Sequence, residues 1–206
     1  MRLYILTLLS FSLFGCLSSV PKKTVNNDLI LGSTSGSKPL KANQIKESLT
    51  LSENQFQAGY GADAHLITDA WIEADEKEKG VTNMLSSQEI QKQIEKSKSL
   101  YKTQSQTCFV FQLHTMDVNR GMFKYWVAKL KDQKDEFHNI EFQNKTGVES
   151  VPEVYKDTWG RMSHNISLGC TQKKIPFEGS FTVYLIPQIK NNSDQNETTE
   201  FIWTFK

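Results

Sequence analysis

The run Thr107-Cys108-Phe109-Val110-Phe111-Gln112-Leu113-His114-Thr115 decides the fold of this chain. Written as a β-strand, it places apolar side chains on both faces, because neither its odd nor its even positions are polar throughout. Aromatic and β-branched residues also favour a pleated, buried surface. The run therefore predicts a central strand that is covered on both sides.

Further strands are predicted around this run, over residues 48–52, 64–74, 122–130, 137–142, 162–170, 180–186 and 200–205. Trp126 and Trp203 fall inside these patterns and are expected in the core. About eight short strands without regular strand–helix alternation predict a mainly β fold, an antiparallel β-sandwich. In outline this arrangement resembles the immunoglobulin-like and transthyretin-like sandwiches.

One amphipathic α-helix is predicted within the β domain, over residues 87–103. Ser86 stands three residues before Glu89, the spacing of a capping box in which each side chain bonds the backbone N–H of the other residue. Ile90 and Ile94 fall on one stripe of this helix, and polar residues cover most of the rest. Packing on the sheet explains the stripe, and a partner that binds the helix surface is the alternative.

The N-terminal segment resembles the signal sequence of bacterial lipoproteins. Arg2 precedes an apolar stretch of about ten residues, whereas a membrane-spanning helix needs about 20. The stretch ends in Leu13-Phe14-Gly15-Cys16, where Leu13, Gly15 and Cys16 match the lipobox of that family. Phe14 stands where a small residue is usual. The resemblance implies that residues 1–15 are removed and that Cys16 carries the lipid, including an acyl chain such as palmitate.

The same resemblance implies a location in the cell envelope. In lipoproteins that an Asp after the lipidated Cys retains at the inner membrane, the absence of that Asp implies sorting to the outer membrane. Leu17 and Ser18 follow Cys16 here. The protein is therefore expected to be lipid-anchored in a bacterial envelope, at the outer membrane.

Residues 16–47 are expected to form the lipidated Cys and a flexible tether. The segment is rich in Ser, Lys, Asn, Thr and Gly, and such a composition buries too little apolar surface to order itself. Val25 and residues 29–31 are its apolar exceptions and could add an N-terminal strand. Residues 48–206 are expected to form a single β domain.

If Cys16 is lipidated, two of the three cysteines are left as a pair, Cys108 and Cys170. An unpaired thiol is a liability in an exported protein, which favours a disulfide between them. Both residues fall in predicted strands, so the bond would join two strands, across the two sheets of a sandwich, and close a loop of about 60 residues. The alternative is two buried, free thiols that pack as small hydrophobes.

The charge balance excludes nucleic acid as a partner. The chain has 24 Lys and Arg side chains against 23 Asp and Glu, and loss of Arg2 with the signal makes the two signs equal. Binding to a polyphosphate backbone needs a surplus of positive charge. We therefore expect no nucleic-acid partner.

The histidines do not indicate a preformed metal site. They stand at positions 65, 114, 138 and 164, without the close spacing of zinc ligands. His114 and Asp117 lie near one predicted strand end, where a turn made by Asp117 is the expected explanation and a bound cation is the alternative. His138 shares a face with Ile140, which predicts a partly buried imidazole with a hydrogen-bond partner.

The remaining motifs do not indicate catalysis. The acidic stretch from Asp69 to Glu78 includes Lys77 and is read as a solvated loop, with a calcium loop as the alternative. The chain has no Gly-x-Ser-x-Gly motif centred on Ser, no P-loop and no dinucleotide-binding glycine pattern. We therefore expect no enzyme activity, no metal and no cofactor.

The candidate partner-binding residues in the sequence are Tyr155, Trp159 and Arg161. They lie in residues 151–161, which show no clean period and are expected to form a long connection between strands. Exposed Tyr, Trp and Arg are the residues that binding hot spots favour. The alternative is a loop folded over the open end of the sandwich.

Together these patterns predict a membrane-anchored envelope lipoprotein with a non-catalytic binding or structural role, exercised through a protein partner. A carrier of lipid or a small ligand is the first alternative, and it requires a large apolar cavity between the sheets. An envelope enzyme is the second, and it requires a His–carboxylate pair in a deep pocket.

Overall fold

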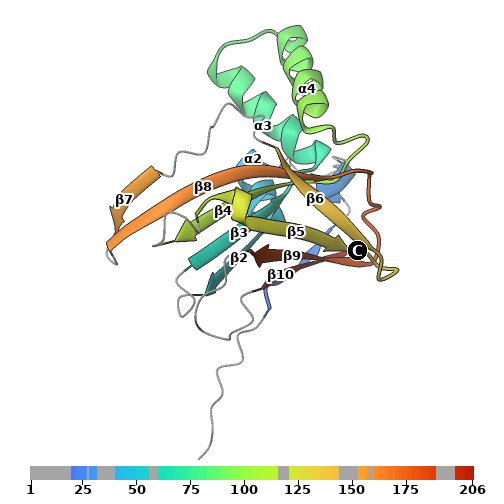
Figure 1. Ribbon diagram of the computed structural model, residues 1–206. Coiled ribbons are helices and arrows are strands. Elements are labelled where there is room, and N and C mark those ends of the chain that lie inside the picture. The colour runs from blue at the N-terminus through green and yellow to red at the C-terminus, as the bar shows by residue number, and fades with distance from the viewer. Residues whose placement is uncertain are drawn as a thin grey trace, which may run out of the picture.

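The computed structural model describes residues 20–26, 28–31, 40–55, 60–115, 121–143, 153–157, 160–188 and 198–206. The strands are β1 (Lys22–Val25), β2 (Thr50–Gln55), β3 (Tyr60–Leu66), β4 (Cys108–Thr115), β5 (Trp126–Lys131), β6 (Phe137–Gln143), β7 (Glu153–Asp157), β8 (Gly160–Thr171), β9 (Ser180–Pro187) and β10 (Thr199–Phe205). The helices are α1 (Asp28–Leu31), α2 (Ala42–Leu49), α3 (Asp69–Thr82), α4 (Ser87–Tyr101) and the short 3-10 helix η2 (Phe123–Tyr125). The fold is mainly β, as predicted, with α3 and α4 standing at one end of the curled sheet (Figure 1).

All the strands belong to one sheet. Their order is β1-β10-β9-β5-β6-β8-β4-β3-β2, and β7 pairs with β8 beside this path. The neighbours are antiparallel except β1 and β10, which are parallel. Strand β6 pairs with both β5 and β8, so it joins the two groups that a sandwich would keep apart. The predicted sandwich of immunoglobulin-like or transthyretin-like outline is therefore not confirmed.

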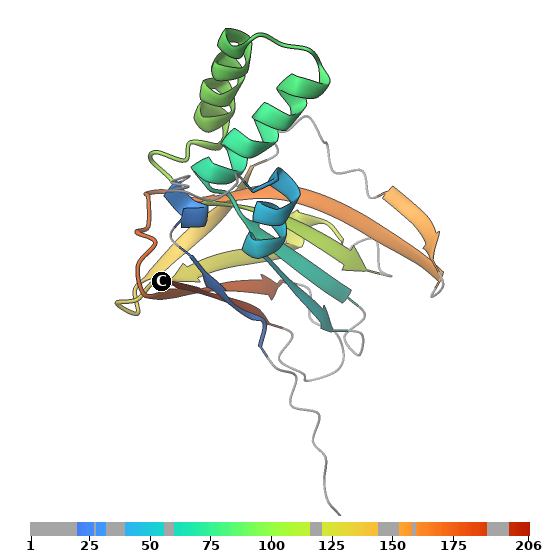
Figure 2. The same ribbon diagram turned by 180° about the vertical axis from the view of Figure 1, so that it is seen from behind.

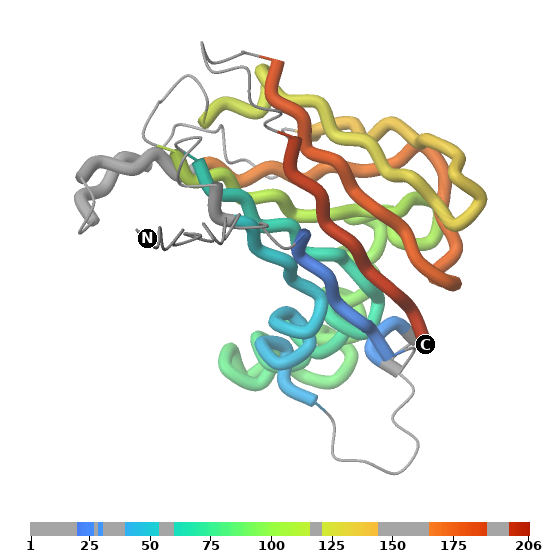
Figure 3. Tube along the Cα trace, turned by 90° about the horizontal axis from the view of Figure 1, so that it is seen from below, coloured from blue at the N-terminus to red at the C-terminus, as the bar shows by residue number. Residues whose placement is uncertain are grey.

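The sheet curls until its two edges nearly meet. Seen from below, β1 and β10 lie beside β2 (Figure 3). Lys23 on β1 donates from Nζ to the carbonyl oxygen of Thr50 on β2, at 3.0 Å. Trp203 on β10 donates from Nε1 to the carbonyl oxygen of Leu49, at 3.1 Å. Side-chain hydrogen bonds thus join the edges of the nearly closed sheet.

The interior of the sheet is filled with aromatic rings. The ring centroid of Phe109 lies 5.9 Å from that of Phe181 and 5.5 Å from that of Trp203. Trp203 is fully buried and Trp126 is 4% exposed, which confirms both tryptophans as core residues. Strand β4 lies between β3 and β8, so the prediction of a central strand is confirmed, but its outward residues Val110, Gln112 and His114 are only partly buried, so the prediction that both faces are covered is wrong.

Helices α3 and α4 form a hairpin inserted between β3 and β4, and it stands away from the sheet (Figure 2). Helix α4 confirms the predicted amphipathic helix and its capping box. The backbone N–H of Ser86 donates to Glu89 Oε2 at 2.8 Å, and Ser86 Oγ accepts from the backbone N–H of Glu89 at 3.4 Å. Ile94 is buried as expected, but α4 packs on α3, so the predicted packing of this helix on the sheet is wrong. The helix ends at Tyr101 rather than at residue 103, because Lys102 takes a left-handed conformation with φ of 49°.

The strand predicted over residues 64–74 is wrong beyond Leu66. Strand β3 ends there, and Thr68 caps α3 by accepting a hydrogen bond from the backbone N–H of Trp71 at 3.2 Å. The acidic residues of this stretch lie on the helix, where Asp75 pairs with Lys79 one turn later at 2.5 Å. Such i,i+4 pairs suit a solvated helix face. The acidic stretch is therefore explained by a helix rather than by a loop.

The chain joins the fold before residue 48, so the prediction of a tether through residue 47 is partly wrong. Strand β1 pairs with β10, and its Val25 is fully buried. Helix α2 buries Ile45 and Leu49, which lie one turn apart. The strand predicted from residue 48 begins only at Thr50, because α2 runs through Leu49. Single apolar residues at strand and helix spacing are enough to dock this polar segment.

Candidate binding site

The candidate partner-binding residues that the structure describes lie in strands and not in a loop. Tyr155 lies in β7 and Arg161 lies in β8, and the register of these strands pairs Lys156 with Arg161. The segment is therefore a hairpin beside β8, which corrects the predicted long connection. Trp159 lies outside the described residues, as does Cys16.

The disulfide between Cys108 and Cys170 is present, as predicted. The two residues are direct partners in the register of β4 and β8, so the bond links neighbouring strands of one sheet. The prediction that it joins two sheets is wrong. Both are at most 2% exposed and pack with Ile67, Ile72 and Leu168 in a small apolar cluster. A buried bond in apolar surroundings is a structural cross-link.

His65 is a buried histidine of the core. His65 is 4% exposed, and its ring contacts that of Trp71 edge-on with centroids 4.8 Å apart. Its Nδ1 lies 3.2 Å from Thr50 Oγ1. Burial, with a smaller contribution from the charge of Lys46, lowers the pKa of His65 to about 3. The imidazole is therefore neutral at neutral pH and serves packing.

His138 is partly buried and has a hydrogen-bond partner, which confirms the prediction for it. Its Nε2 lies 2.9 Å from Asp132 Oδ2, and this contact is the main reason that the pKa of Asp132 lies below its usual value. Asp132 Oδ1 accepts the backbone N–H groups of Lys134 at 2.8 Å and Glu136 at 3.0 Å. Asp132, Glu136 and His138 also lie close enough to hold a metal ion. Both Asp132 oxygens already organise the β5–β6 turn, so the turn accounts for this cluster.

His114 contacts a different carboxylate from the one the sequence suggested. Asp117 lies outside the described residues, and His114 Nε2 instead lies 2.9 Å from Asp63 Oδ2 on the neighbouring strand β3. The side chain of His114 is 22% exposed and that of Asp63 is 30% exposed. The pair therefore lies on an accessible face of the sheet.

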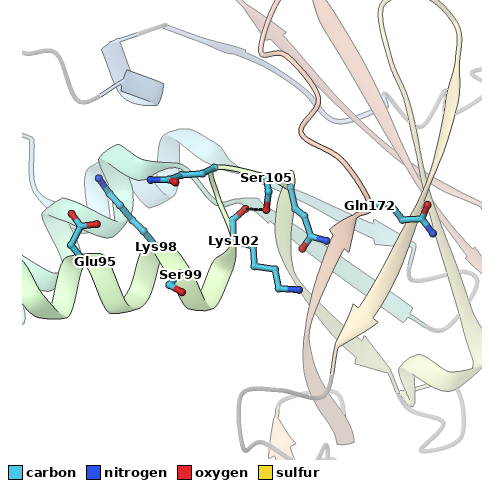
Figure 4. Close-up of a pocket in the computed structure, with 8 residues that line it drawn as sticks. Glu95, Lys98, Ser99, Lys102, Ser105 and Gln172 are labelled. Atoms are coloured by element: carbon cyan, nitrogen blue, oxygen red, sulfur yellow. Dashed lines mark hydrogen bonds between the residues drawn. The ribbon is translucent and has the colours of Figure 1, made fainter.

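An open polar pocket of about 550 Å³ lies beside the end of α4. Its lining residues are Glu95, Lys98, Ser99, Lys102, Gln104, Ser105, Gln106 and Gln172. Figure 4 shows the α4 residues on one side of the pocket and Gln172 on the other. Lys98 Nζ is held by Glu73 Oε1 at 2.9 Å, and Gln106 Oε1 is shielded from solvent without a hydrogen-bond partner in the described chain. The lining side chains of this pocket are all polar or charged.

A second depression, of about 420 Å³, lies on the outer face of the sheet over β5, β6, β9 and β10. We call it the aromatic groove, and its lining residues are Lys129, Phe137, Tyr184, Ile186, Thr198 and Glu200. Lys129 and Glu200 are the register partners of Tyr184 on either side, so the three form one row across the sheet. Phe137 is 61% exposed, and its ring centroid lies 5.9 Å from that of Tyr184.

Sequence reasoning missed the aromatic groove because it looked for inward-facing side chains. In β9 the inward positions are Phe181, Val183 and Leu185, and the outward positions between them should be polar if that face meets only water. Tyr184 and Ile186 break this rule, and so does Phe137 at the start of β6. Apolar residues at outward strand positions are the signal that could have found the groove.

The comparisons with known proteins add no relative. No protein-family model, no curated protein and no solved structure matches this chain. Within the residues that the structure describes, none of the helices has the length and apolar character needed to cross a membrane. The fold and the site therefore describe the class of this protein: a mainly β domain with one disulfide cross-link and an exposed aromatic groove.

Proposed function

We propose that this chain is a lipid-anchored lipoprotein of the bacterial envelope with a non-catalytic binding or structural role, exercised through a protein partner. The aromatic groove is the observation that carries the binding role. The location rests on the Leu13-Phe14-Gly15-Cys16 motif, with sorting to the outer membrane implied by Leu17 and Ser18. The Cys108–Cys170 disulfide supports an oxidising compartment outside the cytoplasm.

A protein is the class of partner that suits the groove. Phe137 and Tyr184 offer large, rigid apolar surface, and Lys129 and Glu200 place one charge of each sign at the ends of the Tyr184 row. Interface cores are enriched in aromatic residues and are surrounded by a polar rim. A uniformly charged ligand would meet one like charge, whereas a protein surface can match both signs.

The packing of the core weighs against a carrier of lipid. A lipid chain would need an apolar cavity inside the sheet, but the rings of Phe109, Phe181 and Trp203 contact one another there. The rings of Phe111 and Phe142 fill a neighbouring part of the interior, with centroids 5.6 Å apart. The interior thus resembles a packed core rather than a binding cavity.

A non-catalytic role is also supported by where the His–carboxylate pairs lie. His138 and Asp132 belong to a turn, and His114 and Asp63 lie on a sheet face. Neither pair lines the polar pocket or the aromatic groove. A general base needs a substrate site within hydrogen-bond reach.

Binding of a small polar ligand is a second candidate function, favoured by the wholly polar lining of the pocket beside α4. In that case a Lys102→Leu variant would weaken binding of the ligand, while changes in the aromatic groove would not affect it.

Site-specific photo-cross-linking in native cells tests the protein-binding role of the groove. A photoreactive residue at position 184 is expected to capture one reproducible envelope or extracellular protein. The same residue at position 81 is the control, because Val81 is 75% exposed but lies on the helical hairpin. Phe137→Ser is expected to weaken capture from position 184 by roughly 30-fold, about 2 kcal/mol of binding, because Phe137 is the most exposed ring of the groove.

The matched control variant is Val81→Ser, which removes an exposed apolar side chain elsewhere and should leave capture unchanged. Circular dichroism and melting curves of both variants check that each is folded. The same proteins captured from positions 184 and 81, or capture that survives Phe137→Ser in full, would show that the groove is not the binding surface.

A further inference from the structure

The chain joins the sheet only a few residues after the proposed lipid anchor. Val20 is the first residue that the structure describes, and residues 17–19 separate it from Cys16 in the sequence. The backbone N–H of Ile202 on β10 donates to the carbonyl oxygen of Pro21 at 3.0 Å, so the chain is fixed to the sheet from Pro21 onward. An extended chain covers at most about 3.6 Å per residue, so Val20 lies within about 14 Å of Cys16.

The start of β1 marks one end of the sheet, which we call the anchor end. Strand β1 is parallel to β10, and β10, β9 and β5 alternate in direction, so β10 and β5 begin where β9 ends. The backbone N–H of Gln188, after β9, donates to the carbonyl oxygen of Tyr125, before β5, at 2.6 Å. The described residues of the anchor end on these strands are 20–22, 121–126, 186–188 and 198–199.

Helices α3 and α4 lie at the opposite end of the sheet. The hydroxyl of Tyr60, at the start of β3, lies 2.9 Å from Thr199 Oγ1 at the start of β10, so β3 begins at the anchor end. The helical hairpin follows the other end of β3, after Leu66. Figure 2 shows the dark blue β1 starting low in the molecule and the hairpin at its top. At a rise of about 1.5 Å per residue, α3 carries the hairpin tip about 20 Å from the sheet.

The side chains of the anchor end suit a surface of lipid headgroups. Among its described residues, the charged ones are Lys22 and Lys124, and both are exposed. Anionic headgroups attract lysine. Lys124 Nζ lies 4.7 Å from the ring centroid of Tyr125, and tyrosine is enriched at membrane interfaces. Tyr60 and Trp126 are buried behind this end with centroids 5.2 Å apart, which fits contact with headgroups at the surface.

The hairpin tip is a less suitable surface for the bilayer, although it exposes apolar side chains. Met84 is 94% exposed and Val81 is 75% exposed. The adjoining helix α3 carries five carboxylates against two lysines, so anionic headgroups repel it. The tip also lies at the far end of the molecule from the point where the chain leaves for Cys16.

We propose that the anchor end rests on the headgroups of the bilayer that holds Cys16, and that the helical hairpin points away from this membrane. This orientation rests on the proposed function, because it requires a lipid on Cys16. It assigns the membrane-facing surface of the domain and leaves the hairpin open to the aqueous side of the envelope.

Fluorescence quenching of the full-length, lipidated protein tests the orientation. The vesicles contain phosphatidylcholine and phosphatidylglycerol, with a nitroxide on a fraction of the headgroups, which quenches only nearby probes. A fluorescent amino acid replaces either Gln188, on the anchor end, or Met84, at the hairpin tip, and both positions are exposed. Quenching at position 188 is expected to be roughly fivefold stronger than at position 84, because the two lie at opposite ends of the molecule. Melting curves check folding, and soluble iodide should quench both probes equally in detergent.

Insertion of about 20 Gly and Ser residues between Ser19 and Val20 is the matched control for the short connection. A flexible segment of that length spans about 25 Å, so quenching at position 188 should fall roughly threefold. Mass spectrometry of the N-terminus separates the two proposals, because an absent lipid on Cys16 would overturn both. Equal quenching at positions 188 and 84 of the lipidated protein, or quenching at 188 that the insertion leaves unchanged, would overturn the orientation alone.

Discussion

Trp203→Ala is expected to lower the free energy of unfolding by about 4 kcal/mol, one of the two largest effects that any single site in this chain should have. Trp203 is fully buried, and its ring lies 5.5 Å from Phe109 and 5.6 Å from Phe181 between centroids. Removal of the indole leaves a cavity among rings that cannot collapse into it. Urea denaturation followed by fluorescence and circular dichroism measures the loss.

Trp203 also helps to close the sheet through its hydrogen bond to Leu49. A second variant separates the contribution of this hydrogen bond from that of packing. Trp203→Phe keeps most of the buried ring but removes the Nε1–H that donates to the carbonyl oxygen of Leu49. An unpaired buried carbonyl costs about 1–3 kcal/mol. We expect the free energy of unfolding of Trp203→Phe to lie between that of the unaltered protein and that of Trp203→Ala. If both variants lose less than about 1 kcal/mol, the described core is not what stabilises the fold.

Loss of the disulfide is expected to have an effect of similar size. Cys108 and Cys170 are 62 residues apart, and closing a loop of this length stabilises a fold by about 4 kcal/mol through the unfolded chain. The double variant Cys108→Ala/Cys170→Ala should therefore unfold at a clearly lower urea concentration. The bond is buried between β4, β8 and the base of the helical hairpin, so a reductant should act slowly on the folded protein.

The unaltered protein, reduced after unfolding and then refolded in reductant, serves as the control. Its stability should match that of the double variant, because both lack the same cross-link. Equal stability of the oxidised and reduced forms would contradict a stabilising role for the bond.

The strands with strong patterns were predictable from the sequence. Alternation in residues 180–186 and 200–205 identified β9 and β10 with their inward residues, and apolar residues on both faces identified β4 as central. The capping box from Ser86 to Glu89 located α4. These signals are local, and local signals decide where an element begins and which face is buried.

The closure of the sheet was not predictable, because it depends on pairing between distant segments. Nothing in the pattern of β6 shows that it pairs with both β5 and β8. Docking of β1 onto β10 rests on few apolar residues, such as Val25, in a polar segment that reads as a tether. In the stretch after Leu66, the Thr68 cap outweighs the strand-like alternation of the following residues.

The candidate site was only partly predictable for the same reason. The number of cysteines, with Cys16 set aside for the lipid, identified the Cys108–Cys170 bond. The aromatic groove gathers Phe137 and Tyr184, and the His114–Asp63 pair gathers side chains of β4 and β3, from strands that meet only in the folded sheet. Composition singled out Tyr155, Trp159 and Arg161 instead, because it cannot show which exposed residues lie side by side.

Mass spectrometry of the mature N-terminus from native cells tests the central proposal, a lipid-anchored envelope protein, most directly. We expect the chain to begin at Cys16 and to carry the mass of a diacylglyceryl group and an acyl chain. The Cys16→Ser form is the control and is expected to leave the membrane fraction. A mature chain that keeps residues 1–15, or that begins near Cys16 without lipid, would contradict the proposed anchor.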